Sequence, residues 1–367
     1  MVDQTKRSLL AAAGAGMVLG IAGARGSVAK APSESRLKLI GTEEHFATPE
    51  YIETFLKLTA NSTSLGDQYA RMFVSKPESR RLLTDFDLRI ADMNRYGVDL
   101  LLLSLVAPGV QAFSPEEGTA LARSVNDEMA VIIKQHPGRL AGLAAVAPQD
   151  PHGAAQEVDR AIAQLGLNGI VINSHTNGEF LDDPKFWPIF DACVRNNAAI
   201  YLHPTFPPDA MIVPYEKYQL QGALMGLGAE CSLHAARLIF GGIFDRYPKL
   251  QIVLGHGGEG LPYWLYRFDN IHALLLSVKA PGMVPLKRRP SDYVRSNFYV
   301  TTSGMFWNPV LEFCVKAVGA DRILFAVDSP FENLGEAADF MRNSPLSAKD
   351  KALIAHGNAQ RIFQIKM

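Results

Sequence analysis

Cysteine is scarce in this sequence, and the cysteines that occur lie far apart. The chain of 367 residues contains Cys193, Cys231 and Cys314, and none of them belongs to a CxxC pair. An odd, widely spaced set does not form a disulfide framework. All three occur in apolar stretches that we expect to be helical, so we interpret them as small buried hydrophobic residues.

An excess of charge of either sign is missing as well. The sequence has 36 Lys and Arg residues against 37 Asp and Glu residues, and its formal net charge at pH 7 is −1. Because no long run of like charges occurs, the sequence offers no electrostatic basis for binding nucleic acid. Small neutral or acidic molecules, attracted by local charge, are the expected ligands.

Long hydrophobic runs are absent except for a weakly apolar stretch near the start. The basic pair Lys6-Arg7 precedes an Ala- and Gly-rich run at positions 9–24, and Ala29-Lys30-Ala31 closes the pattern. A basic start, an apolar centre and small residues at the end are typical of an export signal. The run is too short and too rich in glycine for a stable membrane anchor.

We therefore predict that residues 1–31 are an export signal that directs the chain to the periplasm. The segment at positions 5–10 resembles a twin-arginine leader in which lysine replaces the first arginine. The twin-arginine pathway carries folded proteins, so a metal could be loaded before export. The alternative is a disordered extension on a cytoplasmic enzyme.

The nucleotide-binding signatures of open α/β sheets are also missing, since no GxGxxG or GxxxxGK[ST] follows the first expected strand. From residue 36 onward a short apolar run, a polar turn and an amphipathic stretch recur, and no linker divides the chain. Several runs are continuous in Val, Ile and Leu, as in parallel strands covered on both faces. The runs are Leu37–Phe46, Asp99–Leu105, Leu140–Val146, Gly169–Asn173, Ala199–His203, Gln251–His256, Phe298–Ser303 and Arg322–Asp328.

Eight such units favour an α/β fold of the (β/α)8 type, a TIM barrel, formed by a single domain at residues 36–367. Two connections are long. Residues 47–98 follow the first strand, and residues 204–250 follow the fifth. Both insertions would leave the barrel at its catalytic face, where long loops determine substrate choice.

Four of the runs end in a residue that can bind a metal or move a proton. Glu43 and His45 lie two residues apart in the first run, so they share one face of the strand. His203, His256 and Asp328 close the fifth, sixth and eighth runs. Because the C-terminal strand ends of a parallel barrel meet at one mouth, these side chains could form a catalytic metal site with open coordination.

Other residues near these strand ends are candidates for contacts with substrate or with a ligand. Glu259 follows His256 after two glycines and can orient the imidazole through its second nitrogen. His175 follows the fourth strand and is predicted to line the pocket. Phe46, next to His45, is predicted to contact a substrate ring.

Several blocks of the chain resemble the amidohydrolase superfamily, and in particular its decarboxylase branch, typified by aminocarboxymuconate-semialdehyde decarboxylase. Within that branch the sequence is most similar to the γ-resorcylate and 5-carboxyvanillate decarboxylases. The first motif is Glu-x-His where most superfamily members have His-x-His, and the strand-four lysine of the two-metal enzymes is missing. The blocks include EEHFATPE, INSHTNGEFLDDPKFWPIF, GIFDRYPKLQIVLGHGGEGLPYWLYRFD and RILFAVDSPFEN.

The resemblance implies a role for each candidate residue. His256, backed by Glu259, would sit beside the substrate, and Arg267 would meet an anionic substrate group. Ser329 stands where the family usually has a large aromatic residue, which would enlarge the pocket. The implied ligands of one divalent ion, Mn²⁺ or Zn²⁺, are Glu43, His45, His203 and Asp328.

The implied activity is non-oxidative decarboxylation of a small hydroxylated aromatic acid, with Asp328 as a proton donor that its site holds protonated. The alternative is metal-dependent hydrolysis of a lactone or amide, in which Asp328 would be the base. A barrel that only binds ligands is a third interpretation. The expected partners are a small aromatic carboxylate and further copies of the chain, in a homodimer or homotetramer.

Overall fold

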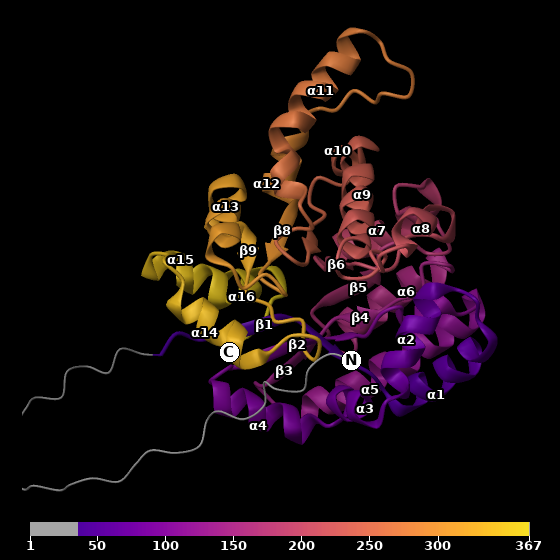
Figure 1. The fold of residues 1–367 in the computed structure, drawn as a ribbon, viewed down its shortest axis with the longest axis vertical. Helices are drawn as coiled ribbons and strands as arrows, with labels where there is room; N and C mark the ends of the chain where they lie inside the picture. Colours follow the sequence, from indigo (N-terminus) through magenta and orange to yellow (C-terminus); the bar gives the residue numbers. More distant parts are fainter. Residues whose placement is uncertain (1–35, 367) are drawn as a thin grey trace, which may run out of the picture. The chain divides into compact units, whose positions relative to one another are not determined.

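A computed structural model describes residues 36–366 of the chain (Figure 1). The predicted export signal at residues 1–31 lies outside the described residues. The strands are β1 (Ile40–Phe46), β2 (Leu100–Leu105), β3 (Leu140–Gly142), β4 (Ala144–Ala145), β5 (Gly169–Asn173), β6 (Ala199–His203), β7 (Ile252–Leu254), β8 (Phe298–Thr301) and β9 (Ile323–Leu324).

These strands form a closed parallel barrel, as predicted. The hydrogen-bonded orders are β1-β2-β3 and β4-β5-β6-β7-β8-β9, and every pair is parallel. The third predicted run is divided at Leu143 into β3 and β4, and the N–H of Leu143 donates to Leu103 on β2 (2.8 Å).

The barrel closes between β1 and the residues that follow β9. The N–H of Thr42 donates to the carbonyl of Phe325 (3.1 Å), and the N–H of His45 donates to that of Ser329 (2.7 Å). A parallel bridge joins Glu44 to Ser329. This pairing joins the first and last strands, so no edge remains there.

An irregularity in β1 changes which of its side chains point into the barrel. Gly41 pairs with Leu101, but the next pair is Glu44 with Leu103, so β1 contains one extra residue. A β-bulge of this kind shifts the alternation of side chains along the strand. Ile40 therefore points inward before the bulge, and Glu43 and His45 do so after it.

The structure has two hydrophobic clusters, one inside the barrel and one between the barrel strands and the surrounding helices. The inner cluster takes side chains from β1, β2, β3 and β5–β9, together with Phe363 and Ile365 near the C-terminus. The outer cluster packs the opposite strand faces against the surrounding helices. Burial on both faces is the reason that the strand runs are continuous in apolar residues.

Helices connect the strands and cover the outside. The helix starts follow ordinary capping rules: the N–H of Glu117 donates to the Ser114 hydroxyl at the start of α5, and that of Gly153 to Asp150 at the start of α6. Between β1 and β5 the helices are α1 (Pro49–Leu58), η1 (Thr59–Asn61), α2 (Leu65–Ser75), α3 (Pro77–Thr84), α4 (Phe86–Tyr96), η2 (Gly109–Ala112), α5 (Pro115–Gln135) and α6 (Pro151–Ala163).

The second half of the barrel follows the same plan. Within residues 36–366 no helix has both the length and the apolar character needed to span a membrane. The helices after β5 are η3 (Pro184–Phe186), α7 (Trp187–Arg195), α8 (Asp209–Glu216), α9 (Gly226–Phe240), α10 (Ile243–Arg246), η4 (Leu261–Trp264), α11 (Leu265–Ser277), α12 (Pro290–Asn297), α13 (Asn308–Val318), η5 (Ala320–Arg322), α14 (Leu334–Asn343), α15 (Ala348–Ala352), η6 (Leu353–Gly357) and α16 (Asn358–Ile362).

The three cysteines are buried and free, in agreement with their interpretation as packing residues. Cys193 lies in α7, Cys231 in α9 and Cys314 in α13. Burial raises the pKa of Cys314 to about 11, so its thiol stays protonated at neutral pH.

The crowding at Gly41 generates a stability prediction. A methyl group at position 41 would overlap Oε1 of Glu44 and lie 2.8 Å from Cδ2 of Leu101. The N–H of Val327 donates a hydrogen bond to Oε1 of Glu44 (3.2 Å), and a movement of the Glu44 carboxylate would break this bond. We expect Gly41→Ala to lower the free energy of unfolding by about 1–3 kcal/mol, measured by urea denaturation.

Gly222→Ala is the matched control, since no heavy atom lies within 4 Å of a Cβ at that position. If Gly41→Ala and the wild type unfolded at the same urea concentration, a methyl group at position 41 would fit beside Glu44 and Leu101, and the prediction would be wrong.

Candidate metal centre and substrate cavity

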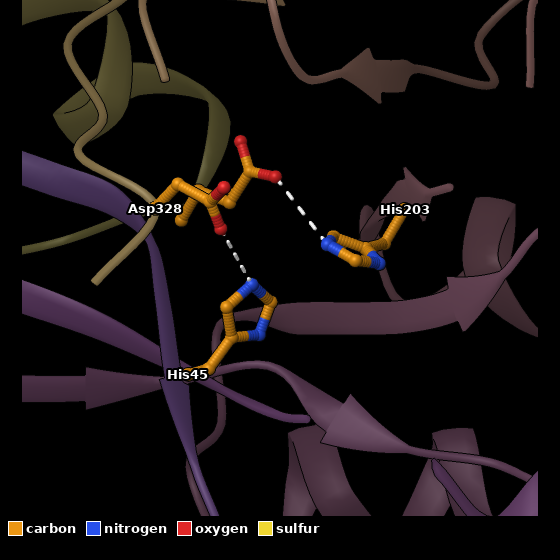
Figure 2. A group of neighbouring side chains, drawn as sticks. His45, His203 and Asp328 are labelled. Atoms are coloured by element: carbon orange, nitrogen blue, oxygen red, sulfur yellow. Dashed lines mark hydrogen bonds and ion pairs between the residues drawn. The ribbon is translucent and has the colours of Figure 1, made fainter. Parts of the chain in front are cut away.

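The predicted ligands meet at the C-terminal mouth of the barrel. One candidate ligand atom from each of Glu43, His45, His203 and Asp328 lies within 4.8 Å of the others. Figure 2 shows His45 on β1, His203 on β6 and Asp328 in the loop after β9 pointing toward one another. The sequence separates these residues by as many as 285 positions (328 minus 43), and barrel closure brings them together.

Both ligands from β1 are held by backbone pairing. The carbonyl of Glu43 accepts the N–H of Asp328 (2.9 Å), so these two ligands are locked side by side. Nε2 of His45 lies 3.0 Å from Oδ1 of Asp328, and Nδ1 lies 3.4 Å from the Ser104 hydroxyl on β2. The imidazole of His45 therefore has a fixed orientation before any ion binds.

Glu43 is a buried carboxylate with one free oxygen. Its Oε2 accepts hydrogen bonds from the hydroxyls of Tyr201 and Thr301, the latter at 3.3 Å. Its Oε1 has no hydrogen-bond partner. Burial raises the pKa of Glu43 above its ordinary value, because the charged form has lost its water.

His203 is a buried imidazole beside that free oxygen. Its Nε2 lies 3.5 Å from Oε1 of Glu43, and its Nδ1 has no hydrogen-bond partner. Burial lowers the pKa of His203 well below its ordinary value. The ring is therefore neutral at pH 7, which is the form that binds metals.

These side chains fit a divalent ion. Buried polar atoms without partners are costly, and Oε1 of Glu43 is such an atom, 3.5 Å from Nε2 of His203. Two carboxylates and two imidazoles are suitable ligands for Mn²⁺ or Zn²⁺. A cation in this cluster would satisfy Oε1 of Glu43, take Nε2 of His203 as a ligand and offset the charge of the carboxylates.

His256 faces the cluster from the loop after β7. Its Nδ1 lies 2.7 Å from Oε1 of Glu259, and its Nε2 lies 3.3 Å from Oδ2 of Asp328. Burial by itself lowers the pKa of His256, but the carboxylates of Glu259 and Glu43 outweigh burial and raise that pKa well above its ordinary value. The prediction that Glu259 backs the imidazole is in keeping with this contact.

The pKa of Asp328 shifts in the opposite direction, below its ordinary value. Burial acts to raise its pKa, but hydrogen bonds from His256 and His45 outweigh burial and hold the pKa of Asp328 well below its ordinary value. The expectation that the site keeps Asp328 protonated therefore does not hold for the protein alone. In the free site the shared proton resides on His256, 3.3 Å from Asp328.

A cavity of about 640 Å³ opens above the cluster, and its wall includes His203, His256 and Asp328. Its outer wall is aromatic and comes from three separate segments. Phe73 on α2 contacts Phe331 with ring centroids 4.7 Å apart, and Phe331 contacts His45 at 5.5 Å. Phe206, after β6, also lines the cavity and contacts Tyr69 on α2, with ring centroids 5.4 Å apart. The size and lining suit an aromatic ring held close to the ligands.

Phe331 alters one expectation about this wall. The sequence predicts a wider pocket because Ser329 replaces a large aromatic residue. In the structure Ser329 pairs with β1 through its carbonyl, and Phe331, two residues later, supplies an aromatic side chain. A sequence pattern does not show this because a loop, not a strand, places Phe331.

His175 lines the cavity, but its ring nitrogens are already occupied. Its Nε2 lies 2.9 Å from the carbonyl of Phe206, and its Nδ1 accepts the N–H of Gly178 (3.1 Å). Burial lowers the pKa of His175, so the ring is neutral. A contact with substrate would therefore use the carbon edge or the face of the ring.

Two residues predicted to contact the substrate, Phe46 and Arg267, do not line the cavity. Phe46 is fully buried in the outer hydrophobic cluster, because it follows His45 on β1 and so points to the other face of the wall. Arg267 is exposed on α11, which extends away from the strands (orange in Figure 1), and it does not line the cavity.

Tyr201 was missed by sequence reasoning, although a signal for it exists. It precedes His203 by two residues on β6, so both side chains point into the barrel. Ser174, Glu230 and His234 form a second missed group behind the cavity wall. The sequence contains no signal for that group, because α9 is placed by tertiary packing.

The fold and the site together define a barrel enzyme with a mononuclear metal centre at the C-terminal strand ends. Residues 44–365 match the amidohydrolase family model, and the chain belongs to this family. It is 37% identical over 336 residues to the γ-resorcylate decarboxylase of Polaromonas sp. strain JS666, covering 89% of this chain and 98% of that protein.

Solved structures agree with this placement. The 5-carboxyvanillate decarboxylase of Sphingomonas paucimobilis is 40% identical, with a TM-score of 0.87 over 90% of this chain and all of that one. A dihydroxybenzoic acid decarboxylase from Polaromonas sp. JS666, with bound manganese and the inhibitor 2-nitroresorcinol, is 36% identical, with a TM-score of 0.79 over 89% of this chain and 97% of that one.

The Tyr201 hydroxyl generates a prediction for the metal centre. It donates to one oxygen of Glu43 and so directs the other oxygen toward the cluster. We expect Tyr201→Phe to weaken Mn²⁺ binding by about 10–100-fold with little loss of fold. Titration of the metal-free protein followed by calorimetry measures this change.

Tyr299→Phe is the control, since Tyr299 also points into the barrel but contacts Arg361 through its hydroxyl (3.3 Å). If both variants bound Mn²⁺ as the wild type does, the Tyr201 hydroxyl would have no part in orienting Glu43.

Proposed function

We propose that this chain is a manganese-dependent, non-oxidative decarboxylase of a small hydroxylated aromatic acid. The observation that carries the proposal is the cluster of Glu43, His45, His203 and Asp328 directly beneath an aromatic-walled cavity. The relatives that support it are named as decarboxylases of γ-resorcylate and 5-carboxyvanillate, and some of their structures hold manganese.

An ion held by Glu43, His45, His203 and Asp328 would supply positive charge that stabilises the anionic groups of the substrate. The chain's own residues orient the ring. Phe73, Phe206 and Phe331 surround it and exclude water. Among the described residues that line the cavity none is Lys or Arg, so His256 is the cationic side chain available to the substrate.

Decarboxylation needs a proton at the ring carbon that bears the carboxylate. In our proposal Asp328 delivers this proton, and His256 supplies it across their 3.3 Å contact. The new C–H bond interrupts the aromatic ring, the bond to the carboxylate then breaks, and its electrons restore aromaticity as CO₂ leaves. Glu259 holds His256 in place throughout.

Hydrolysis is the competing activity for the same cluster, with Asp328 as base. The two activities are separated by assaying one Mn²⁺-loaded preparation for CO₂ release from 2,6-dihydroxybenzoate and for hydrolysis of an aromatic lactone. We expect CO₂ release. Lactone hydrolysis without CO₂ release from any hydroxybenzoate would overturn the proposed function.

The export signal and the assembly state also belong to this proposal. We infer that residues 1–31 direct the chain to the periplasm, on the basis of their basic, apolar and small-residue order. We also infer a homodimer or homotetramer. Fusion of residues 1–31 to a reporter that is active only in the periplasm tests the first inference, and light scattering tests the second.

The proton-donor role of Asp328 generates a prediction for catalysis. Asp328→Asn retains an oxygen ligand but cannot donate an acidic proton, so kcat should fall by about 10²–10⁴-fold. The measurement is CO₂ release by protein whose manganese content equals that of the wild type.

Asp321→Asn is the control, because the Asp321 side chain lies on η5 and is 58% exposed. Near-normal turnover by manganese-loaded Asp328→Asn would exclude Asp328 as the donor and leave His256 as the direct source of the proton.

A further inference from the structure

A buried polar group lies directly behind the cavity wall and takes no part in the chemistry described above. It consists of Ser174, after β5, and Glu230 and His234, one turn apart on α9. These residues are 0%, 2% and 0% exposed, respectively. Polar side chains this deep are retained only where their hydrogen bonds serve the structure or the site.

The hydrogen bonds within this group run in one direction. The N–H of Leu181 donates to Nε2 of His234 (2.9 Å). Burial lowers the pKa of His234 to about 3, so the ring is neutral and its single proton is on Nδ1. Nδ1 then donates to the Ser174 hydroxyl (2.9 Å), which donates to Oε1 of Glu230 (2.8 Å).

Ser174 is the strained residue of this chain of hydrogen bonds. Its φ is +44°, in the left-handed region that residues other than glycine rarely adopt. This conformation turns the backbone between Asn173 and His175, and both neighbours line the cavity. Asn173 is in register with the ligand His203 on the adjacent strand.

A second clamp holds the same turn from the other side. Gln111 on η2 accepts the N–H of Asn173 (2.6 Å) and donates to the carbonyls of Asn173 and His175, both at 3.2 Å. Its amide also donates to the Thr176 hydroxyl (2.8 Å). The turn that forms this part of the wall is therefore fixed between Gln111 and α9.

We propose that Ser174, Glu230 and His234 are positioning residues that set the cavity wall at Asn173 and His175 for the aromatic substrate. This inference rests on the proposed function of the same cavity. Glu230 also contacts the next loop, because the backbone N–H groups of His175 and Thr205 both point to its carboxyl group. One side chain of α9 thus joins the loops after β5 and β6.

Glu230 performs this role as a neutral acid at pH 7. Burial is the largest influence and raises the pKa of Glu230 to about 8, and the nearby carboxylate of Glu259 raises it further. The hydrogen bonds from Ser174, His175 and Thr205 act in the opposite direction.

Three other groups next to Glu230 that can titrate, His234, Cys231 and His175, keep one charge state near pH 8. His234 stays neutral because burial lowers its pKa to about 3, and burial raises the pKa of the Cys231 thiol well above its ordinary value. Burial also lowers the pKa of His175. Ionisation of Glu230 near pH 8 is therefore the event expected to change the hydrogen bonds that hold this part of the wall.

Two substitutions at Glu230 and one at Ser174 test the proposal in the manganese-loaded full chain. Ser174→Gly removes the hydroxyl while glycine accepts the positive φ, and Glu230→Ala removes the carboxyl. Each should raise KM for 2,6-dihydroxybenzoate by about three- to tenfold, with a smaller change in kcat and unchanged manganese content. Glu230→Gln, which is neutral and nearly the same shape, should keep the wild-type KM at pH 7.

The pH profile separates positioning from simple packing. Wild-type KM should change between pH 7 and 9 as Glu230 ionises, and the pH profile of KM for Glu230→Gln should lack that change. The pH dependence of folding stability gives a second test. The folded pKa of Glu230 exceeds the unfolded value, so wild-type stability falls as the pH rises from about 4.5 toward 8. The melting temperature of Glu230→Gln minus that of the wild type should therefore increase as the pH rises across this range. This measurement does not depend on enzyme activity.

Leu233→Ala is the control, because Leu233 lies on the same helix and is 38% exposed. The proposal is overturned if Ser174→Gly and Glu230→Ala keep the wild-type KM, or if Glu230→Gln behaves as Glu230→Ala does. If calorimetry showed that the wild type binds 2,6-dihydroxybenzoate but the protein released no CO₂, the proposed function would be wrong. The positioning proposal would not be contradicted by that result. In that case the dissociation constants of the variants replace KM in the test.

Discussion

The backbone hydrogen bonds that close the barrel between β1 and the residues after β9 are the constraint on which the site depends. The N–H of Asp328 donates to the carbonyl of Glu43, and the N–H of His45 donates to that of Ser329. The same bonds complete the wall and set three of the four candidate ligands side by side. A closed sheet has fixed strand neighbours, so the ligands cannot separate without opening the barrel.

Burial then controls the charge state of each side chain at the mouth. It favours the neutral form of His203, whereas hydrogen bonds from two histidines keep Asp328 ionised. The carboxylates around His256 keep that imidazole protonated. A proton is thus stored next to an anionic acceptor, in a cavity whose remaining wall is aromatic, polar and, at Asp67, Asp209 and Glu332, acidic.

Each functional side chain is held by a further residue behind it. Tyr201 orients Glu43, Glu259 orients His256, and Glu230 with His234 fixes the turn at Ser174. These supporting residues come from the barrel interior, a loop and α9, respectively. Such preorganisation is what allows a site at the ends of separate strands to keep its geometry.

The amino-acid sequence by itself determined the barrel and the metal ligands. Continuous apolar runs identify parallel strands, and polar residues at their ends are expected at the mouth, so Glu43, His45, His203, His256 and Asp328 could be grouped without coordinates. The resemblance to the amidohydrolase superfamily then separated His256 from the four implied ligands. Tertiary structure alone decided the bulge in β1, the exposure of Arg267, the outward direction of Phe46 and the aromatic wall at Phe331. The reason is physical: strand alternation and closure are local and periodic, whereas the path of a loop and the approach of a helix depend on packing between residues far apart in the chain.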